Sequence, residues 1–232
     1  MKIALIGYGA MGKLIRTLAE EKGHEIAVVI DNADASLTAA QLSQKLVGCD
    51  AAIDFTTAEA VRRNVEACIL AGVPLLEGTT GWNHQHAEIE RTVREGLGAM
   101  VFGANFSIGV NLFYRIGDFA SELFAKFPEY EAFIEEQHHS RKKDSPSGTA
   151  LKLKDIVARH IDHDVSVSAT RAGNIPGTHR VGFDGPADQV LLEHTARSRE
   201  GFSAGAILAA EWIVGKKGFY EFTDVMDEIV GK

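Results

Sequence analysis

The chain has 232 residues, 45% of them hydrophobic, which is long enough to bury one large core or two modest ones. Its formal net charge of −8 argues against nucleic acid as a main partner. No apolar run approaches the roughly 18 residues of a membrane span, and the apolar run before Gly7 is too short for a signal peptide. We therefore expect a cytoplasmic protein with no membrane partner. The spacing of Cys49 and Cys68 does not suit a metal, so we expect no bound metal.

The first predicted elements are a strand, a glycine-rich turn and a helix. Residues 3–6 form an apolar run typical of a buried parallel strand. The turn Gly7–Gly12 follows, and apolar residues then recur at helical spacing. A second strand, at 25–30, ends at Asp31. A G-x-G-x-x-G turn between a strand and a helix, with an acid after the next strand, is typical of a dinucleotide-binding site.

This turn also bears on the choice of cofactor. The glycines permit a tight turn and the close approach of a pyrophosphate, while Asp31 can accept hydrogen bonds from the adenosine ribose. The Asp31 carboxylate repels a 2′-phosphate and slightly favours NADH, but Lys13 at the helix start can attract phosphate, so both NADH and NADPH stay open. The predicted cofactor contacts of the turn are Gly7, Tyr8, Gly9, Ala10, Met11, Gly12 and Lys13.

Strands and helices continue to alternate up to about residue 102. We expect strands at 49–55, 73–77 and 99–102, and helices at 57–71 and 84–95. This alternation predicts a doubly wound parallel sheet with its ligand at the carboxyl ends of the strands. Small and hydroxyl-bearing residues that suit a nicotinamide ribose and carboxamide fall there, although ordinary loops have similar compositions: Phe55, Thr56, Gly78, Thr79 and Thr80.

After Gly103 the pattern changes to a hinge, a strongly apolar helix and a second group of strands. Strands expected at 130–137, 165–170, 177–183 and 189–196 indicate a second α+β domain with a mixed, largely antiparallel sheet. A helix can cover one face of such a sheet and a partner subunit the other, so we expect an oligomer. The last helices return to the first, Rossmann-like domain. The predicted division is 1–106 with 207–232 for the dinucleotide, and 107–206 for substrate binding and oligomerisation.

Residues 135–150 concentrate the groups that can do chemistry. His138 and His139 titrate near neutral pH, and Lys142 adds a cation. Pro146 cannot lie inside a helix, so Ser147, Gly148 and Thr149 are expected to open one. Ala150 and Lys152 stand where the acid of a capping box would be, which leaves the helix N-terminus able to bind an outside anion. The segment therefore predicts a small-anion pocket beside a proton donor; a solvated polar loop is the alternative.

These motifs together resemble the 4-hydroxy-tetrahydrodipicolinate reductase family over nearly the whole chain. The signature H-H-x-x-K-x-D-x-P-S-G-T-A matches residues 138–150, and residues 105–111 resemble the hinge of the family. The resemblance implies reduction of a cyclic imine dicarboxylate with NADH or NADPH by a homotetramer. It implies that His138 is the general acid, with Lys142 assisting. It assigns substrate carboxylates to His139, Lys142, Ser147, Gly148 and Thr149, and further cofactor contacts to Asn105 and Phe106.

One segment departs from the family, and two other functions remain open. The family has a longer insertion where this chain has the short segment 161–171, which affects loop contacts and subunit packing. An amino- or imino-acid dehydrogenase, such as an aspartate dehydrogenase-like enzyme, would share the first hundred residues but has no need of the signature. A cofactor-sensing regulatory module would bind NADH and have no anion pocket.

Overall fold

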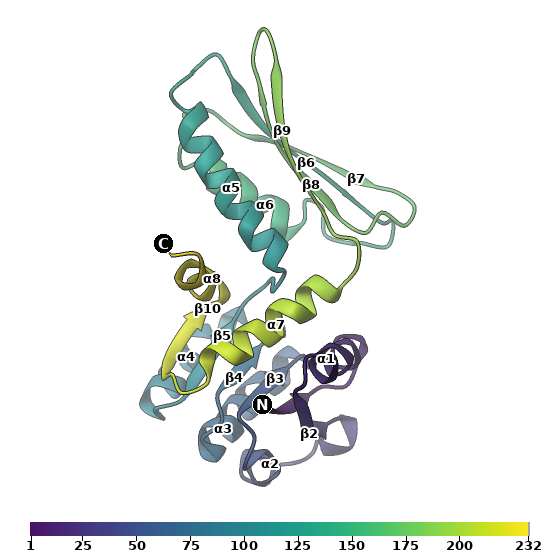
Figure 1. Ribbon diagram of the computed structural model, residues 1–232, viewed down its shortest axis with the longest axis vertical. Coiled ribbons are helices and arrows are strands. Elements are labelled where there is room, and N and C mark those ends of the chain that lie inside the picture. The colour runs from purple at the N-terminus through teal and green to yellow at the C-terminus, as the bar shows by residue number, and fades with distance from the viewer. Residues whose placement is uncertain (232) are drawn as a thin grey trace. The chain divides into compact units, whose positions relative to one another are not determined.

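The computed structural model describes residues 1–231 and divides them into two compact units (Figure 1). The first unit contains Met1–Ile108 and the chain from Glu200 onward, and the second contains Gly109–Arg199. The predicted return at residue 207 falls inside a continuous helix that begins at Glu200, so the chain rejoins the first unit at the start of that helix.

The first unit is built on a parallel sheet, as the sequence predicts. Within residues 1–231 this sheet has six strands in the order β10-β5-β4-β3-β1-β2, all paired in parallel. The strands are β1 (Lys2–Ile6), β2 (Glu25–Ile30), β3 (Ala51–Asp54), β4 (Leu75–Glu77), β5 (Ala99–Phe102) and β10 (Gly218–Glu221). The helices are α1 (Ala10–Glu21), α2 (Ala39–Leu46), α3 (Ala58–Ala71), α4 (His86–Glu95), α7 (Glu200–Ile213) and α8 (Phe222–Val230), with short 3₁₀ turns η1 (Asn32–Asp34) and η2 (Asn83–Gln85).

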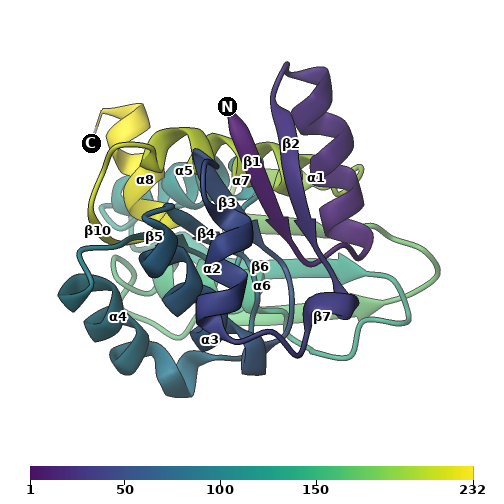
Figure 2. The same ribbon diagram turned by 90° about the horizontal axis from the view of Figure 1, so that it is seen from below.

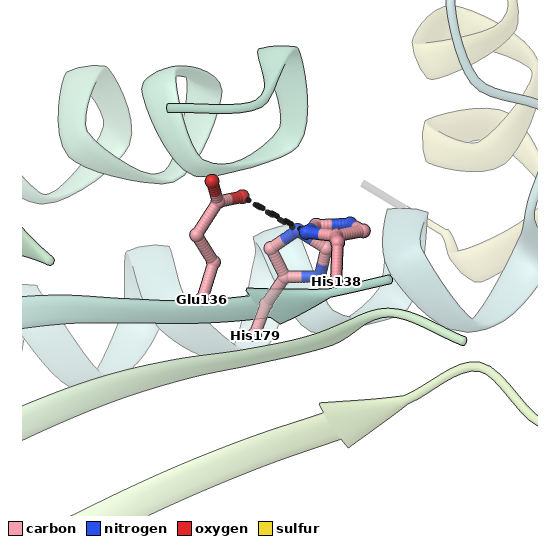
Figure 3. Close-up of side chains that lie close together, drawn as sticks. All are labelled: Glu136, His138 and His179. Atoms are coloured by element: carbon pink, nitrogen blue, oxygen red, sulfur yellow. Dashed lines mark ion pairs between the residues drawn. The ribbon is translucent and has the colours of Figure 1, made fainter. Parts of the chain in front are cut away.

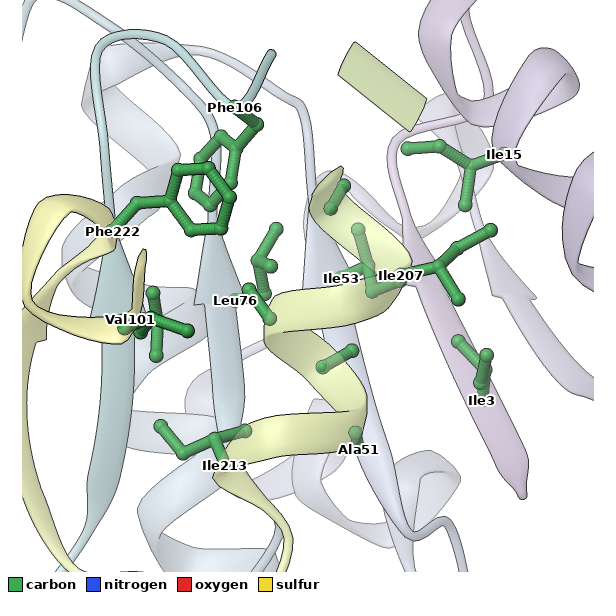
Figure 4. Packing of buried hydrophobic residues seen from close by; sticks show 14 of the residues in the cluster. Ile3, Ile15, Ala51, Ile53, Leu76, Val101, Phe106, Ile207, Ile213 and Phe222 are labelled. Carbon is green, nitrogen blue, oxygen red and sulfur yellow. The ribbon is translucent and has the colours of Figure 1, made fainter. Parts of the chain in front are cut away.

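Side chains alternate across this sheet and form a hydrophobic core on each face. Ile3 and Leu5 point toward α1 and α7, while Ala4 and Ile6 point toward α2 and α3. Figure 2 shows α2, α3 and α4 on one side of the sheet and α7 on the other. Figure 4 shows Ile207 of α7 against the sheet residue Ile53. Both faces are covered, which is why the strands are apolar runs and do not alternate with polar residues.

The second unit has a mixed sheet, also as predicted. The strands β6 (Glu131–His138), β7 (Ser166–Arg171), β8 (Thr178–Asp184) and β9 (Gln189–Thr195) lie in the order β7-β6-β8-β9. β7 runs parallel to β6, whereas β8 and β9 are antiparallel to their neighbours. The helices α5 (Ile108–Phe124) and α6 (Gly148–Val157) cover one face, and their core includes Phe113, Leu153 and Val181. α6 is the crossover that makes the β6–β7 pair parallel.

Among residues 1–231, no helix combines the length and hydropathy needed to cross a bilayer.

Candidate active site

The glycine turn after β1 has the close backbone packing that a dinucleotide needs. Gly7 has φ +92°, and its N–H donates to the carbonyl of Ile30 at 2.8 Å. A Cβ on Gly12 would lie 2.2 Å from the carbonyl oxygen of Gly7, and one on Gly7 would lie 2.3 Å from that of Phe55. Only glycine fits at these two positions, so the backbone stays open to a pyrophosphate.

The N-terminus of α1 is suited to an anion. Gly9 is its N-cap and provides no side-chain acceptor, and the first turn, residues 10–13, contains no acid and ends in exposed Lys13. The N–H groups of this turn and the helix dipole therefore favour a phosphate. Arg16 adds a second cation, whose guanidinium donates to the Tyr8 hydroxyl at 3.2 Å. Arg16 has no predicted role, because nothing in the glycine motif specifies a cation one turn into the helix.

Asp31 lies at the end of β2, as predicted, and is exposed. One of its oxygens, Oδ1, accepts a hydrogen bond of 2.9 Å from the N–H of Ala33 and so caps η1. This bond fixes the carboxylate at the carboxyl end of the strand, where an adenosine ribose binds in this fold class.

The two loops predicted to contact the nicotinamide lie together at the ends of β3 and β4. The N–H of Thr56 donates to Oγ1 of Thr79 at 3.0 Å, and the N–H of Thr79 donates to Oε1 of Glu77 at 2.7 Å. The Phe55 ring covers Gly78, where a Cβ would lie 2.3 Å from the ring. Thr79 is buried and Thr80 is exposed.

The hinge residues differ from each other in what they can offer a cofactor. Asn105 accepts a hydrogen bond of 2.9 Å from the N–H of Ser107 through Oδ1. The Phe106 side chain is buried and packs against Phe222, with ring centroids 4.8 Å apart. Phe106 can therefore reach a cofactor only through its backbone.

In the second unit, the signature residues gather around the carboxylate of Glu136. Glu136 and His138 are two residues apart on β6, so both point to the same face of the sheet. Glu136 is the register partner of His179 on β8, and His138 is that of Arg171 on β7. Arg171 donates to Oε1 of Glu136 at 2.6 Å and also to the carbonyl of Asp144 at 2.6 Å. The sheet register thus assembles one acid, one cation and two imidazoles.

Glu136 also holds the start of α6. Its Oε1 accepts a hydrogen bond of 2.9 Å from the N–H of Ser147, and its Oε2 accepts a short one from the Ser147 hydroxyl. Ser147 is the N-cap of α6, and its Oγ accepts from the N–H of Ala150 at 3.2 Å. As expected, the first turn of α6 has no acid and no capping box. A carboxylate from the neighbouring strand, eleven residues earlier in sequence, binds the N-cap residue instead.

This capping changes which groups of α6 face outward. Ser147 is buried, whereas Gly148 is exposed and Thr149 is half-buried. Gly148 and Thr149 are the first two residues of α6, at the positive end of the helix dipole. The geometry thus favours backbone binding of an anion over a contact with the Ser147 hydroxyl.

The two imidazoles next to Glu136 are held close to each other (Figure 3). Nδ1 of His138 and Nε2 of His179 each lie 3.5 Å from Oε2 of Glu136, and the two rings are 5.0 Å apart. Burial lowers the pKa of His179 to about 4, with further lowering by His138. Burial also lowers the pKa of His138, and the Glu136 carboxylate offsets part of this. The two side chains therefore hold less imidazolium at neutral pH than the sequence suggests.

Glu136 itself remains ionised. Burial alone would raise its pKa, but the hydrogen bonds from Ser147 and Arg171 outweigh burial and keep the pKa below its ordinary value. The ligand atoms of Glu136, His138 and His179 lie within 4.8 Å of one another, close enough for a metal ion. Both Glu136 oxygens, however, already accept hydrogen bonds, and the Arg171 guanidinium supplies the positive charge at this point.

The remaining predicted residues are at the edge of this cluster. Nζ of Lys142 pairs with Oδ1 of Asp144 at 2.9 Å, within the same loop. His139 is half-buried and follows the end of β6, and its Nδ1 has no hydrogen-bond partner among the described residues. Glu136, Arg171 and His179 had no predicted role, although the two-residue spacing of Glu136 and His138 on one strand is a signal in the sequence for the first of them.

Comparison with known proteins shows the family and the fold of the chain. The family model for the N-terminus of dihydrodipicolinate reductase matches residues 1–106, and the model for its C-terminus matches residues 109–226. A 4-hydroxy-tetrahydrodipicolinate reductase of Christiangramia forsetii is 34% identical over 99% of both chains. One of Archaeoglobus fulgidus is 33% identical over 98% of this chain and 100% of the relative. A solved structure shows the same fold: that of a dipicolinate-bound dihydrodipicolinate reductase from Paenisporosarcina sp. TG-14. The match has a TM-score of 0.80 at 21% identity and covers 97% of this chain and 99% of that one.

Proposed function

The chain belongs to the dihydrodipicolinate reductase family and is an NAD(P)H-dependent oxidoreductase that reduces 4-hydroxy-tetrahydrodipicolinate in the diaminopimelate route to lysine, and we propose that His138, Lys142 and the start of α6 perform its chemistry. The observation that carries this proposal is the shared carboxylate of Glu136. The same Oε2 atom contacts His138 and the Ser147 N-cap. A proton donor and an anion-binding helix start are thereby held by one buried group.

The two ends of the substrate are bound by different groups in this proposal. One carboxylate accepts hydrogen bonds from the N–H groups of Gly148 and Thr149, next to the Ser147 cap, and gains from the helix dipole. The other carboxylate binds His139 and Lys142, which exchanges its partner Asp144 for substrate. Two fixed ends set the orientation of the ring, and this orientation is a large part of catalysis by proximity.

His138 supplies the proton. The nicotinamide, when bound, donates a hydride to the conjugated imine ring, which then requires a proton on an adjacent ring carbon. A positioned imidazolium accelerates such a step by roughly 10²–10⁴-fold. Burial lowers the pKa of the free His138, but a dicarboxylate substrate brings negative charge next to it and raises its pKa again. Binding of the substrate thus raises the pKa of His138, and the imidazole takes up a proton from solvent.

The first unit binds the cofactor through the glycine turn, Asp31, the loops after β3 and β4, and the backbone of Asn105 and Phe106. The cradle formed by Gly7 and Gly12 supports this assignment. We further propose that Asp31 gives a modest preference for NADH, because its carboxylate accepts from a ribose hydroxyl and repels a 2′-phosphate. Asp31→Asn should raise kcat/KM for NADPH relative to NADH.

We also propose a homotetramer in the cytoplasm. Apolar side chains are exposed along α5 and on β9 of the second unit, which supports a subunit contact there: Leu112, Ile116, Phe119, Leu123, Val190 and Leu191. Two free thiols, Cys49 and Cys68, fit a reducing compartment. Light scattering across a concentration series tests the mass, and a monomer at all concentrations contradicts the tetramer.

A coupled assay tests the site. The upstream synthase supplies fresh substrate from pyruvate and aspartate semialdehyde, and loss of NADH or NADPH absorbance is followed. We expect His138→Gln to lower kcat by about 10²-fold or more with little change in KM. Lys142→Ala should mainly raise KM. Lys143→Ala, an exposed neighbour, is the matched control. Turnover by His138→Gln equal to that of the wild type contradicts the assignment of the acid.

A further inference from the structure

Two carboxylic acids lie side by side at the carboxyl end of the parallel sheet. Asp54 is the last residue of β3 and Glu77 the last of β4, and they are register partners. Both side chains are fully buried, at 0% exposure, on the face that packs against α3. Their neighbours in the same row of the sheet are Ile6 and Phe102, which are apolar. Two adjacent buried carboxylates without a cation cannot both ionise.

The hydrogen bonds occupy one oxygen of each acid and leave the other oxygen without a partner. Oδ2 of Asp54 accepts from Nδ2 of Asn64 at 2.6 Å, and Oε1 of Glu77 accepts from the N–H of Thr79 at 2.7 Å. The two remaining oxygens, Oδ1 of Asp54 and Oε2 of Glu77, have no hydrogen-bond partner among residues 1–231. Burial, followed by the charge of Asp54, raises the pKa of Glu77 well above its ordinary value, so a protonated Glu77 can donate to the unpartnered oxygen of Asp54.

This pair is joined directly to both loops at the end of the sheet. Glu77 fixes the N–H of Thr79, whose Oγ1 accepts from the N–H of Thr56 at 3.0 Å. Asn64 bridges Asp54 and Oγ1 of Thr56, the latter at 3.3 Å. Nε1 of Trp82 donates to the carbonyl of Thr79 at 2.8 Å. Each acid is therefore tied to the loop that follows its own strand, and the bond between Thr56 and Thr79 joins the two loops to each other.

We propose that Asp54 and Glu77, joined by one shared proton, are positioning residues that hold these two loops in the geometry that binds the nicotinamide half of the cofactor. The inference deepens the proposed function and rests on the assignment of Phe55, Thr56, Gly78, Thr79 and Thr80 to the cofactor. The charge of the pair is −1 while the proton is present. Loss of the proton places two repelling carboxylates under the loops and weakens cofactor binding.

Other titratable and charged groups near the pair are few and can be separated from it. On α3, the buried Cys68 thiol has a pKa raised by burial and then by Asp54 and Glu77. Also on α3, Arg63 donates to Oδ1 of Asn64 at 3.1 Å and so orients the amide toward Asp54. On α4, His86 stacks on Trp82 with ring centroids 5.7 Å apart. A Glu77→Gln variant keeps all three groups and removes only the shared proton.

The test is a set of amide substitutions with equilibrium binding of NADH and NADPH followed by cofactor fluorescence. Glu77→Gln and Asp54→Asn each retain one donor between the two side chains, so at pH 7 their Kd should stay within about threefold of the wild type. In the double variant the two amide oxygens accept hydrogen bonds from Asn64 and from the N–H of Thr79, so two amide NH₂ groups face each other without an acceptor. We expect its Kd to rise about tenfold, far more than the single effects combined. Glu59→Gln, an exposed acid of α3, is the control.

A pH series separates positioning from a purely structural role. As the pH is raised above 7, the Kd of the wild type should rise as the pair loses its proton, and that of Glu77→Gln should stay constant. Thermal unfolding of each variant is measured alongside, because a purely structural role lowers Tm and leaves the Kd of the folded protein unchanged. Wild-type-like binding by the double variant, or equal pH slopes, overturns the inference alone. A wild type that binds neither cofactor overturns the cofactor assignment and the inference with it.

Discussion

The carboxylate of Glu136 on β6 accepts a hydrogen bond of 2.9 Å from the N–H of Ser147, and so a strand residue caps the helix that follows eleven residues later. The same carboxylate binds Arg171 at 2.6 Å and lies 3.5 Å from Nδ1 of His138. Because one fully buried group serves three partners, its loss should affect both the fold and the chemistry of the second unit.

Glu136→Gln should therefore lower both the free energy of unfolding and kcat. The variant loses the charge that pairs with Arg171, and we expect the free energy of unfolding to fall by about 2 kcal/mol. It also loses the acceptor that faces His138, and kcat should fall about tenfold or more. Urea unfolding and steady-state kinetics measure the two effects. Glu135→Gln, on the opposite face of the same strand, should change unfolding by less than about 0.5 kcal/mol. Equal effects of the two substitutions contradict this role.

The pH dependence of turnover should report His138. In the proposed mechanism the protonated imidazole of His138 is the active form, and burial lowers its pKa in the free enzyme. Log kcat/KM should therefore fall as the pH rises through that lowered pKa. The kcat profile reports the substrate complex. It should fall at a higher pH than the kcat/KM profile, because the bound dicarboxylate raises the pKa of His138. Glu136→Gln removes a charge that raises the pKa and should shift the kcat/KM limb to lower pH. Superimposable kcat and kcat/KM profiles would argue against substrate-assisted protonation.

Glu77 should make folding stability depend on pH. The folded protein holds a proton on Glu77 well above its ordinary pKa of 4.5, whereas the unfolded chain releases it there. The native state then binds more protons, so the wild type loses stability relative to Glu77→Gln as the pH rises from 4.5 toward the folded pKa. The difference should change by about 1.4 kcal/mol per pH unit in this window. Urea titrations of both proteins between pH 5 and 8 measure the slope, and parallel curves would show that Glu77 is ionised in the native state.

Gly9 and Gly12 should respond differently to the same substitution. A Cβ at Gly12 would lie 2.2 Å from the carbonyl of Gly7, so Gly12→Ala should displace the turn, lower Tm and weaken cofactor binding. A Cβ at Gly9 meets no atom within 4 Å, so Gly9→Ala should leave Tm nearly unchanged. It should still weaken binding, because the new methyl group stands where a pyrophosphate approaches the backbone. Thermal melts and NADH titrations of the two variants, in the same buffer, test this separation.

The sequence by itself determined the fold class, since strand–helix alternation with apolar runs requires a parallel sheet covered on both faces. It also predicted that residues 138–150 and 7–13 carry the chemistry, because each segment is contiguous and contains its own local signals. Only the tertiary structure decided that Glu136 caps α6 and faces His138 and His179, and that Asp54 and Glu77 lie side by side in a buried position. Those contacts join strands that are far apart in sequence, and they depend on the register of the sheet. A single amino-acid sequence contains no direct signal for that register. Burial, which sets the charges of both clusters, is likewise a property of the packed molecule.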